Sequence, residues 1–376
     1  MKKWILIILT FFIYTLNAQQ NNKWGILGRY INYLVNDTAD VSKPKLLIYP
    51  TIGFSPETSW EFGFSSLYVY YANRDTSNRL SELSGFTFYT LENQYGLWLD
   101  HALYSDKNKW FFLGKFRYQS FPLLYYGIGP NSQAEPLAEI EGNYLFLKER
   151  VLREIKPSFY GGLEIDYQSL RSVHYEDEDI GLTRPLGGNG STNLGLGFGL
   201  VYDNLHNALN ARHGLFNELA LIQYHDVWGS EFNFTSIVSD NRIYRPVNKN
   251  DVLAAQIFGR FIVDGEAPFN QLSLLGGENL MRGYYLGRYR DKNILAAQVE
   301  YRMLPFWFSK RWGASFFLAA GQVYGDDSKL AINQFLPTAG TGIRFLLFPD
   351  KDIFTRLDFA FTQEGTGIYF FIGEAF

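Results

Sequence analysis

Residues 273–302 read SLLGGENLMRGYYLGRYRDKNILAAQVEYR, and the two halves of this stretch follow different patterns. The first half surrounds Arg282 with four glycines: Gly276, Gly277, Gly283 and Gly287. The second half alternates apolar and polar residues, as a β-strand does. Ordering a long glycine-rich loop costs conformational entropy. The sequence therefore predicts that another part of the chain binds this loop and holds it.

The composition excludes several classes of protein. The 376 residues carry a formal net charge of -4, which does not indicate a nucleic-acid binder. They include no cysteine, so disulfides and thiol chemistry are excluded. Aromatic residues make up 18% of the chain, although the mean hydropathy is only -0.14. A membrane barrel that is apolar outside, polar inside and girdled by aromatic residues combines these two properties.

Strand-like alternation recurs along the chain. Residues 59–71 place Trp60, Phe62, Phe64, Ser66, Tyr68 and Tyr70 on one face. Residues 109–119 and 352–362 likewise set aromatic and aliphatic residues against charged ones such as Lys115, Arg117 and Arg356. The charged face returns strand after strand, which predicts a shared polar lumen. A soluble sandwich has the same period. The aromatic content and an apolar run at residues 1–18 that is typical of a signal peptide favour an all-β transmembrane antiparallel barrel instead.

The alternating segments number about sixteen, each close to the length that a tilted membrane strand needs. Their predicted starts are residues 45, 59, 83, 95, 109, 137, 156, 193, 214, 230, 252, 293, 312, 337, 352 and 368. Residues 137–155 are ambiguous, because the charges near their end have helix-like spacing. An even number of strands puts both ends in the periplasm. It also puts the long connections, at about 121–136, 168–192, 264–292 and 325–336, on the extracellular side.

The start of the chain predicts export. Lys2 and Lys3 precede a short apolar run, and Ala18 suits cleavage before Gln19, so residues 1–18 are typical of a signal peptide. A single membrane-spanning helix is the alternative, but the run is short for that role. Residues 19–44 then form a short periplasmic lead, and residues 45–376 form the outer-membrane β-barrel. We therefore predict the bacterial outer membrane as the location.

The end of the chain reads IYFFIGEAF over residues 368–376. Alternation predicts one apolar face, with Glu374 near the membrane edge; that face consists of Ile368, Phe370, Ile372 and Phe376. A last strand that ends in an aromatic residue resembles the signal by which outer-membrane barrels are recognised for assembly. Phe370, Ile372 and Phe376 are the candidate signal residues. The alternative is an ordinary edge strand that happens to stop at Phe.

The central stretch resembles the bacterial surface-antigen barrels, the superfamily of BamA, TamA and the two-partner secretion transporters. The matching motif consists of Gly276, Gly277, Met281, Arg282, Gly283 and Tyr284, followed by the Glu300-Tyr301-Arg302 strand end. Residues 122–131 (PLLYYGIGPN) and 47–63 resemble the family's Tyr-Gly-x-Gly segment and first hairpin. Asp203, Asn204, Gly214, Asp358 and Phe376 also fit the family pattern. The resemblance covers essentially all of residues 45–376.

The resemblance implies that a loop at about 264–292 folds into the barrel lumen and that Arg282 pairs with Glu300. Alternation places Glu300 and Arg302 on the lumen face, and an unpaired buried cation would be costly. The family has a second acidic residue at the position that Ala319 occupies in this chain, so that acid is missing. Either Glu300 holds Arg282 alone or another acid, such as Asp358, takes part. A solvated loop arginine is the alternative.

The sequence predicts no catalytic residue, no metal site and no cofactor. The five histidines lack metal-ligand spacing, and no nucleophile elbow occurs. The resemblance implies a non-enzymatic barrel that assembles or translocates a protein or lipid client. Family members that insert proteins usually carry periplasmic POTRA domains, which residues 19–44 are too short to hold, so that role does not transfer automatically.

Two other functions stay open from the sequence. One is a passive channel for small solutes, although the internal loop should occlude a wide pore. The other is a structural barrel that anchors an outer-membrane complex. In each case the expected partners are outer-membrane lipid, the barrel-assembly machinery during biogenesis, and protein partners or clients, with no nucleic acid.

Overall fold

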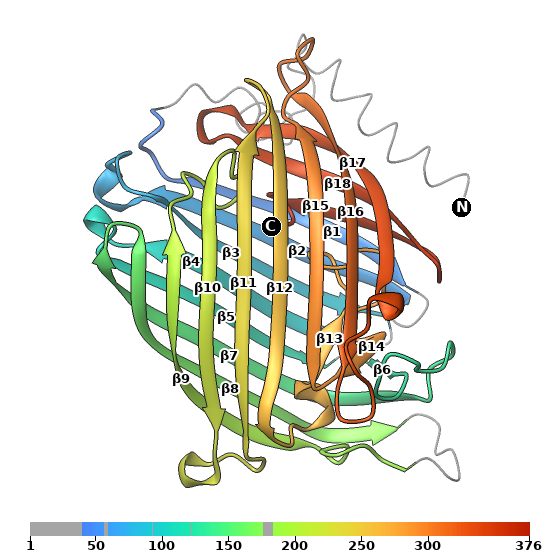
Figure 1. The fold of residues 1–376 in the computed structure, drawn as a ribbon. Helices are drawn as coiled ribbons and strands as arrows, with labels where there is room; N and C mark the ends of the chain where they lie inside the picture. The colour runs from blue at the N-terminus through green and yellow to red at the C-terminus, as the bar shows by residue number, and fades with distance from the viewer. Residues whose placement is uncertain (1–39, 56–58, 92, 121, 176–182) are drawn as a thin grey trace.

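The computed structural model describes residues 40–376, apart from 56–58, 92, 121 and 176–182 (Figure 1). The predicted signal peptide, most of the predicted lead and the middle of the predicted first hairpin lie outside the described residues.

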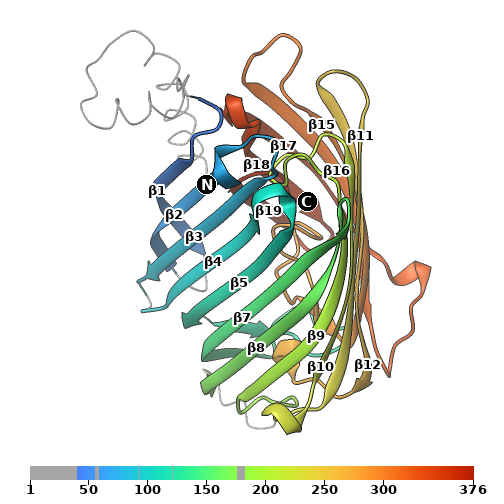
Figure 2. The same ribbon diagram turned by 90° about the vertical axis from the view of Figure 1, so that its left-hand side faces the viewer.

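Sixteen strands form one antiparallel wall (Figures 1 and 2). They are β1 (Lys45–Ser55), β2 (Ser59–Tyr71), β3 (Leu80–Thr90), β4 (Tyr95–Tyr104), β5 (Trp110–Ser120), β7 (Ala138–Lys156), β8 (Phe159–Tyr175), β9 (Ser191–Asp203), β10 (Gly214–Tyr224), β11 (Phe234–Pro246), β12 (Asp251–Gly265), β15 (Asn293–Met303), β16 (Trp312–Tyr324), β17 (Leu336–Phe348), β18 (Ile353–Thr362) and β19 (Thr366–Ile372). Each begins within four residues of its predicted start, and the predicted sixteen-stranded barrel is confirmed.

Three short strands lie outside this count. β6 (Leu123–Tyr125) pairs with β7 and continues the line of β5, and β13 (Ser273–Leu275) pairs with β14 (Tyr289–Asp291) in a separate hairpin. In the part of the chain that the structure describes, the helices are 3-10 turns of three residues: η2 (Ala72–Arg74), η3 (Asp106–Asn108), η4 (Asp226–Trp228), η5 (Phe269–Gln271), η6 (Ile332–Gln334) and η7 (Pro349–Lys351). Within the described residues, no helix is long and apolar enough to cross a membrane.

Neighbouring residues on each strand face opposite environments. On β8, Leu163 is 75% exposed whereas Glu164 is 3% exposed, and on β17 Ile343 is exposed whereas Arg344 is fully buried. Apolar residues thus cover the outside and charged residues line the lumen, the reverse of a soluble sandwich. This arrangement satisfies a lipid surface on one side and a polar interior on the other.

The connections divide between the two ends of the barrel. We call the end where β1 begins and β19 stops the proximal end, and the opposite end the distal end. The long connections all lie at the distal end, and their described residues are 126–137, 183–190, 266–292 and 325–335. The predicted connection at 168–192 was wrong at its start, because β8 keeps pairing with β7 as far as Tyr175. The ambiguous residues 137–155 belong to β7, which pairs with neighbours along both edges.

Side chains connect the first and last parts of the wall at the proximal end. Lys45 of β1 pairs with Asp350 at 3.3 Å, and Lys351 Nζ donates to the Val41 carbonyl at 2.8 Å. An apolar cluster also joins β1–β3 to the β17–β18 region: Leu47, Leu67, Val69, Leu80, Phe348 and Ile353. We call this junction between the two ends of the wall the seam.

A lipid-facing wall makes a testable prediction at Leu318, which lies at the middle of β16 and is 60% exposed. Leu318→Arg should lower the free energy of unfolding in phospholipid vesicles by about 2–4 kcal/mol, because a charge then faces the bilayer centre. Urea unfolding measures the loss, and Leu318→Phe should behave like the wild type. An unchanged unfolding midpoint for Leu318→Arg would show that this face does not contact lipid.

Candidate functional site

The connection between β12 and β15, residues 266–292, folds back into the lumen. Its backbone takes left-handed conformations that favour glycine, with φ of 116° at Gly276 and 103° at Gly283. Gly283 also lies so close to the wall that an added Cβ would be 2.5 Å from Thr362 Cγ2. The glycines therefore allow the loop to bend and to approach β18.

Apolar and polar contacts on either side of Arg282 fix the loop. Met281 is fully buried in an apolar cluster with Ala296 and Ala319 of the wall. The Tyr284 hydroxyl donates to the Pro337 carbonyl at 3.1 Å. These anchors offset part of the entropy lost when the loop becomes ordered.

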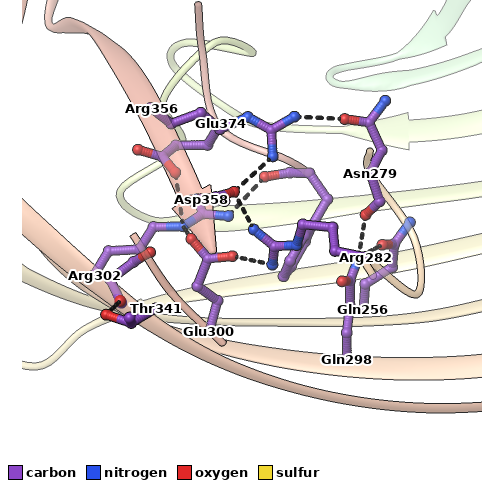
Figure 3. Close-up of polar contacts among 12 residues, drawn as sticks. Gln256, Asn279, Arg282, Gln298, Glu300, Arg302, Thr341, Arg356, Asp358 and Glu374 are labelled. Atoms are coloured by element: carbon purple, nitrogen blue, oxygen red, sulfur yellow. Dashed lines mark hydrogen bonds and ion pairs between the residues drawn. The ribbon is translucent and has the colours of Figure 1, made fainter. Parts of the chain in front are cut away.

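Arg282 lies between two carboxylates inside the barrel (Figure 3). Its Nη2 donates to Glu300 Oε2 at 2.6 Å, and its Nη1 donates to Asp358 Oδ2 at 2.6 Å. The guanidinium carbon also lies 3.5 Å from the centre of the Phe317 ring, a favourable cation–π geometry. The planar guanidinium meets β15, β16 and β18 at once, which a lysine could not do. We call this arrangement the latch.

The latch belongs to a larger buried cluster. Arg344 Nη2 donates to Glu300 at 2.9 Å, and its Nη1 donates to Asp358 at 2.6 Å. Arg302 donates to Glu300 at 3.2 Å, and Arg356 donates to Asp358 at 3.1 Å. Glu374 then accepts from Arg344 Nε at 3.0 Å. Among the described residues, the cluster holds four guanidiniums (Arg282, Arg302, Arg344, Arg356) and three carboxylates (Glu300, Asp358, Glu374); all seven are almost completely buried.

Burial makes the pairing in this cluster strict. Moving a charge out of water carries a large desolvation cost, and only the attraction of a well-placed partner charge offsets it. Each of Glu300 and Asp358 accepts from three guanidiniums, so the loss of either acid strands several cations together. The arrangement is suited to holding a loop against the wall of the barrel.

Arg282 has a second acidic partner although Ala319 stands where the sequence comparison expected one. Ala319 lies in the apolar cluster beside Met281, and Asp358 on β18 accepts from Arg282 instead. Of the three residues expected around Arg282, Glu300 and Asp358 bond to it directly. Arg302 does not; it binds Glu300 from the other side and donates to the Phe376 carbonyl at 3.0 Å.

The prediction of one shared face at the end of the chain was wrong for Phe376, and so was the membrane-edge position predicted for Glu374. Ile368 and Phe370 are exposed on the outside of the barrel, and Ile372 packs against the seam cluster. Gly373 has a φ of 87°, and this turn takes the chain inward. As a result, Phe376 is only 4% exposed and packs against Arg302 and Tyr244, and Glu374 is buried among the arginines rather than at the membrane edge.

Two arginines of the loop were not singled out from the sequence. Arg288 pairs with Glu364 in the β18–β19 turn at 2.8 Å. Arg290 is fully buried; it donates to the Leu124 carbonyl at 3.1 Å, and burial lowers its pKa to about 10. The alternating RYR sequence at 288–290 is the only signal that marks them. Within the described residues, no cluster of histidines and acids could hold a metal ion.

Comparison with known proteins gives one family match. The Omp85 superfamily domain matches residues 50–376 of the chain. No curated protein sequence matches it.

Three solved structures share the fold. BamA from Haemophilus ducreyi lacking POTRA domains 1-3 is 14% identical, with a TM-score of 0.53; the match covers 88% of this chain and 69% of that one. CdiB from Escherichia coli is 10% identical (TM-score 0.54) and CdiB from Acinetobacter baumannii is 12% identical (TM-score 0.53). Both CdiB matches cover 88% of this chain, which spans 62% and 59% of those chains, less than two thirds of each. At these identities the likeness shows the fold.

The latch predicts strong coupling between Arg282 and Glu300. Each alanine substitution alone should lower the free energy of unfolding by about 3–5 kcal/mol, because it strands buried partners. The double variant should lose less than the sum of the two, by about 1 kcal/mol or more. Heat-dependent gel mobility and urea unfolding of the refolded barrel measure these losses.

A matched control uses Glu149→Ala, because Glu149 is partly exposed and pairs with His101 instead. Its effect should add to that of Arg282→Ala. Simple additivity between Arg282 and Glu300 would mean that the two side chains do not pair with each other.

Proposed function

We propose a function from one established premise: the chain belongs to the Omp85 superfamily, whose domain covers residues 50–376. The resemblance predicted from the central stretch is thereby confirmed. The proposed function is non-enzymatic assembly or translocation of a protein or lipid client at the bacterial outer membrane, in concert with partner proteins. The predicted signal peptide would direct export to that membrane.

The observation that carries this proposal is the latch. It joins the lumen loop to β15 and β18, and Arg344 extends the same cluster to β17. This side of the wall is thus braced by buried ion pairs. The seam, in contrast, is joined among the described residues by a few side chains at its proximal end. We propose that the braced side stays fixed while the seam opens to a client strand or lipid.

The same observation argues against a wide passive channel. The loop from 266 to 292 occupies the lumen, and its side chains Met281, Arg282 and Tyr284 are buried there rather than lining open water. A purely structural anchor would not need a charged cluster inside the barrel, since apolar packing of similar volume is often as stable.

Depletion of the protein from its parent bacterium should change the composition of the outer membrane. We expect a lower abundance of specific outer-membrane proteins or lipids, measured by proteomics and lipid analysis of isolated membranes. Wild type and Leu318→Phe should restore the profile, and Arg282→Ala should restore it only in part. An unchanged profile after depletion would contradict the proposed function.

Purified protein in planar bilayers should show no stable conductance, because the lumen loop blocks the path for ions. An open porin measured in the same bilayers serves as the positive control. A steady conductance from the wild-type protein would favour the passive channel instead.

A further inference from the structure

A ten-residue connection at the proximal end, residues 204–213, is longer than most connections at that end and crosses the mouth of the barrel. It links β9 to β10, yet its contacts reach β1–β3 on one side and β17–β19 on the other. We call it the strap. Leu205 and Ala211 are buried in an apolar cluster with inward residues of the wall such as Tyr160 and Val201.

One side of the strap binds the β2–β3 turn. Arg79 in this turn donates to the Leu205 carbonyl through Nη2 at 2.6 Å and through Nε at 3.1 Å. Arg79 also forms an ion pair with Asp203, which in turn accepts from the Tyr104 hydroxyl at 2.9 Å. The start of the strap is therefore tied to the first strands of the wall.

The other side of the strap binds the β17–β18 turn. Asn207 Nδ2 donates to the Lys351 carbonyl at 2.8 Å, and Asn210 Nδ2 donates to the Asp352 carbonyl at 3.0 Å. Arg212 forms a two-pronged ion pair with Asp352, with Nη2 2.6 Å from Oδ1. These bonds run from a turn between β9 and β10 to residues about 140 positions later in the chain.

Leu209 lies at the middle of the strap and reaches the seam itself. Its side chain packs against the cluster that contains Leu47 of β1 and Ile353 of β18. Its carbonyl accepts from the Glu374 N–H at 2.9 Å, two residues after the end of β19. One residue of the strap thus contacts both edges of the seam.

We propose that the strap is a clamp that holds the seam closed at the proximal end, and that it must detach before the seam opens. A connection that only joined β9 to β10 would not need bonds to both ends of the wall. The clamp would regulate the opening of the seam. This inference rests on the proposed function, in which the seam opens to a client. Its test uses purified protein without client, so the clamp and the proposed function can fail independently.

The test uses the absence of cysteine from the chain. Leu47→Cys places a single thiol in the seam cluster, at a position that is 4% exposed. A membrane-impermeant maleimide then reports how often the seam opens in the refolded, purified barrel. Ala296→Cys, fully buried on β15 beside the lumen loop, is the matched reporter away from the seam.

Two strap variants weaken the clamp in different ways. Leu209→Asn removes the apolar contact of a half-buried leucine and should raise the labelling rate at residue 47 by about ten-fold, the scale set by the transfer free energy of part of a leucine side chain. Asp352→Asn breaks the pair with Arg212, yet asparagine tolerates the left-handed conformation at this position (φ 52°). It should raise the rate several-fold. Ala208→Ser, exposed on the same strap, and Leu209→Met should leave the rate near wild type.

The labelling rates decide the proposal. Faster labelling at residue 47 with unchanged labelling at residue 296 supports a clamp on the seam. Equal acceleration at both positions would mean general loosening and would overturn it. Unchanged labelling at residue 47 in both strap variants, with folded mobility retained on gels, would also overturn it.

Discussion

The structure depends on one buried ion pair cluster, in which Arg282 must find two acids inside the barrel. A guanidinium taken out of water is tolerable only with partners in place, and those partners stand on β15 and β18. The loop position, the inward face of those strands and the packing of Phe317 against the guanidinium all follow from that requirement. The positive φ of Gly276 and Gly283 follows too, because the chain must turn sharply to bring Arg282 there.

Much of the barrel could be predicted from the sequence because alternation is a local property. A strand of β-barrel wall shows its two faces within a few residues, so Leu163 and Glu164 already reveal outside and inside. The latch required more than a local pattern. Asp358 lies 76 positions from Arg282, and no spacing rule joins them. The successive pairing of β15, β16, β17 and β18, together with the loop folding back into the lumen, brings the two residues together.

The end of the chain and the strap could not be predicted from the sequence, and each has a physical reason. Alternation continued through residues 368–376 places Phe376 on the same face as Ile368 and Phe370, but one glycine with positive φ, Gly373, ends the strand geometry and turns the chain inward. The strap was missed because its partners are backbone carbonyls such as those of Lys351 and Asp352. Backbone groups carry no sequence signature, so asparagines such as Asn207 and Asn210 resembled ordinary turn residues.

Glu374 connects the arginine cluster to the strap. Its carboxylate accepts from Arg344 in the arginine cluster at 3.0 Å, while its backbone N–H donates to Leu209 of the strap at 2.9 Å. A shift of the cluster that moves Arg344 must therefore move the residue that the strap holds, and the reverse is equally true because energetic coupling is reciprocal. The buried end of the chain is thus the physical link by which the lumen loop and the seam can influence each other.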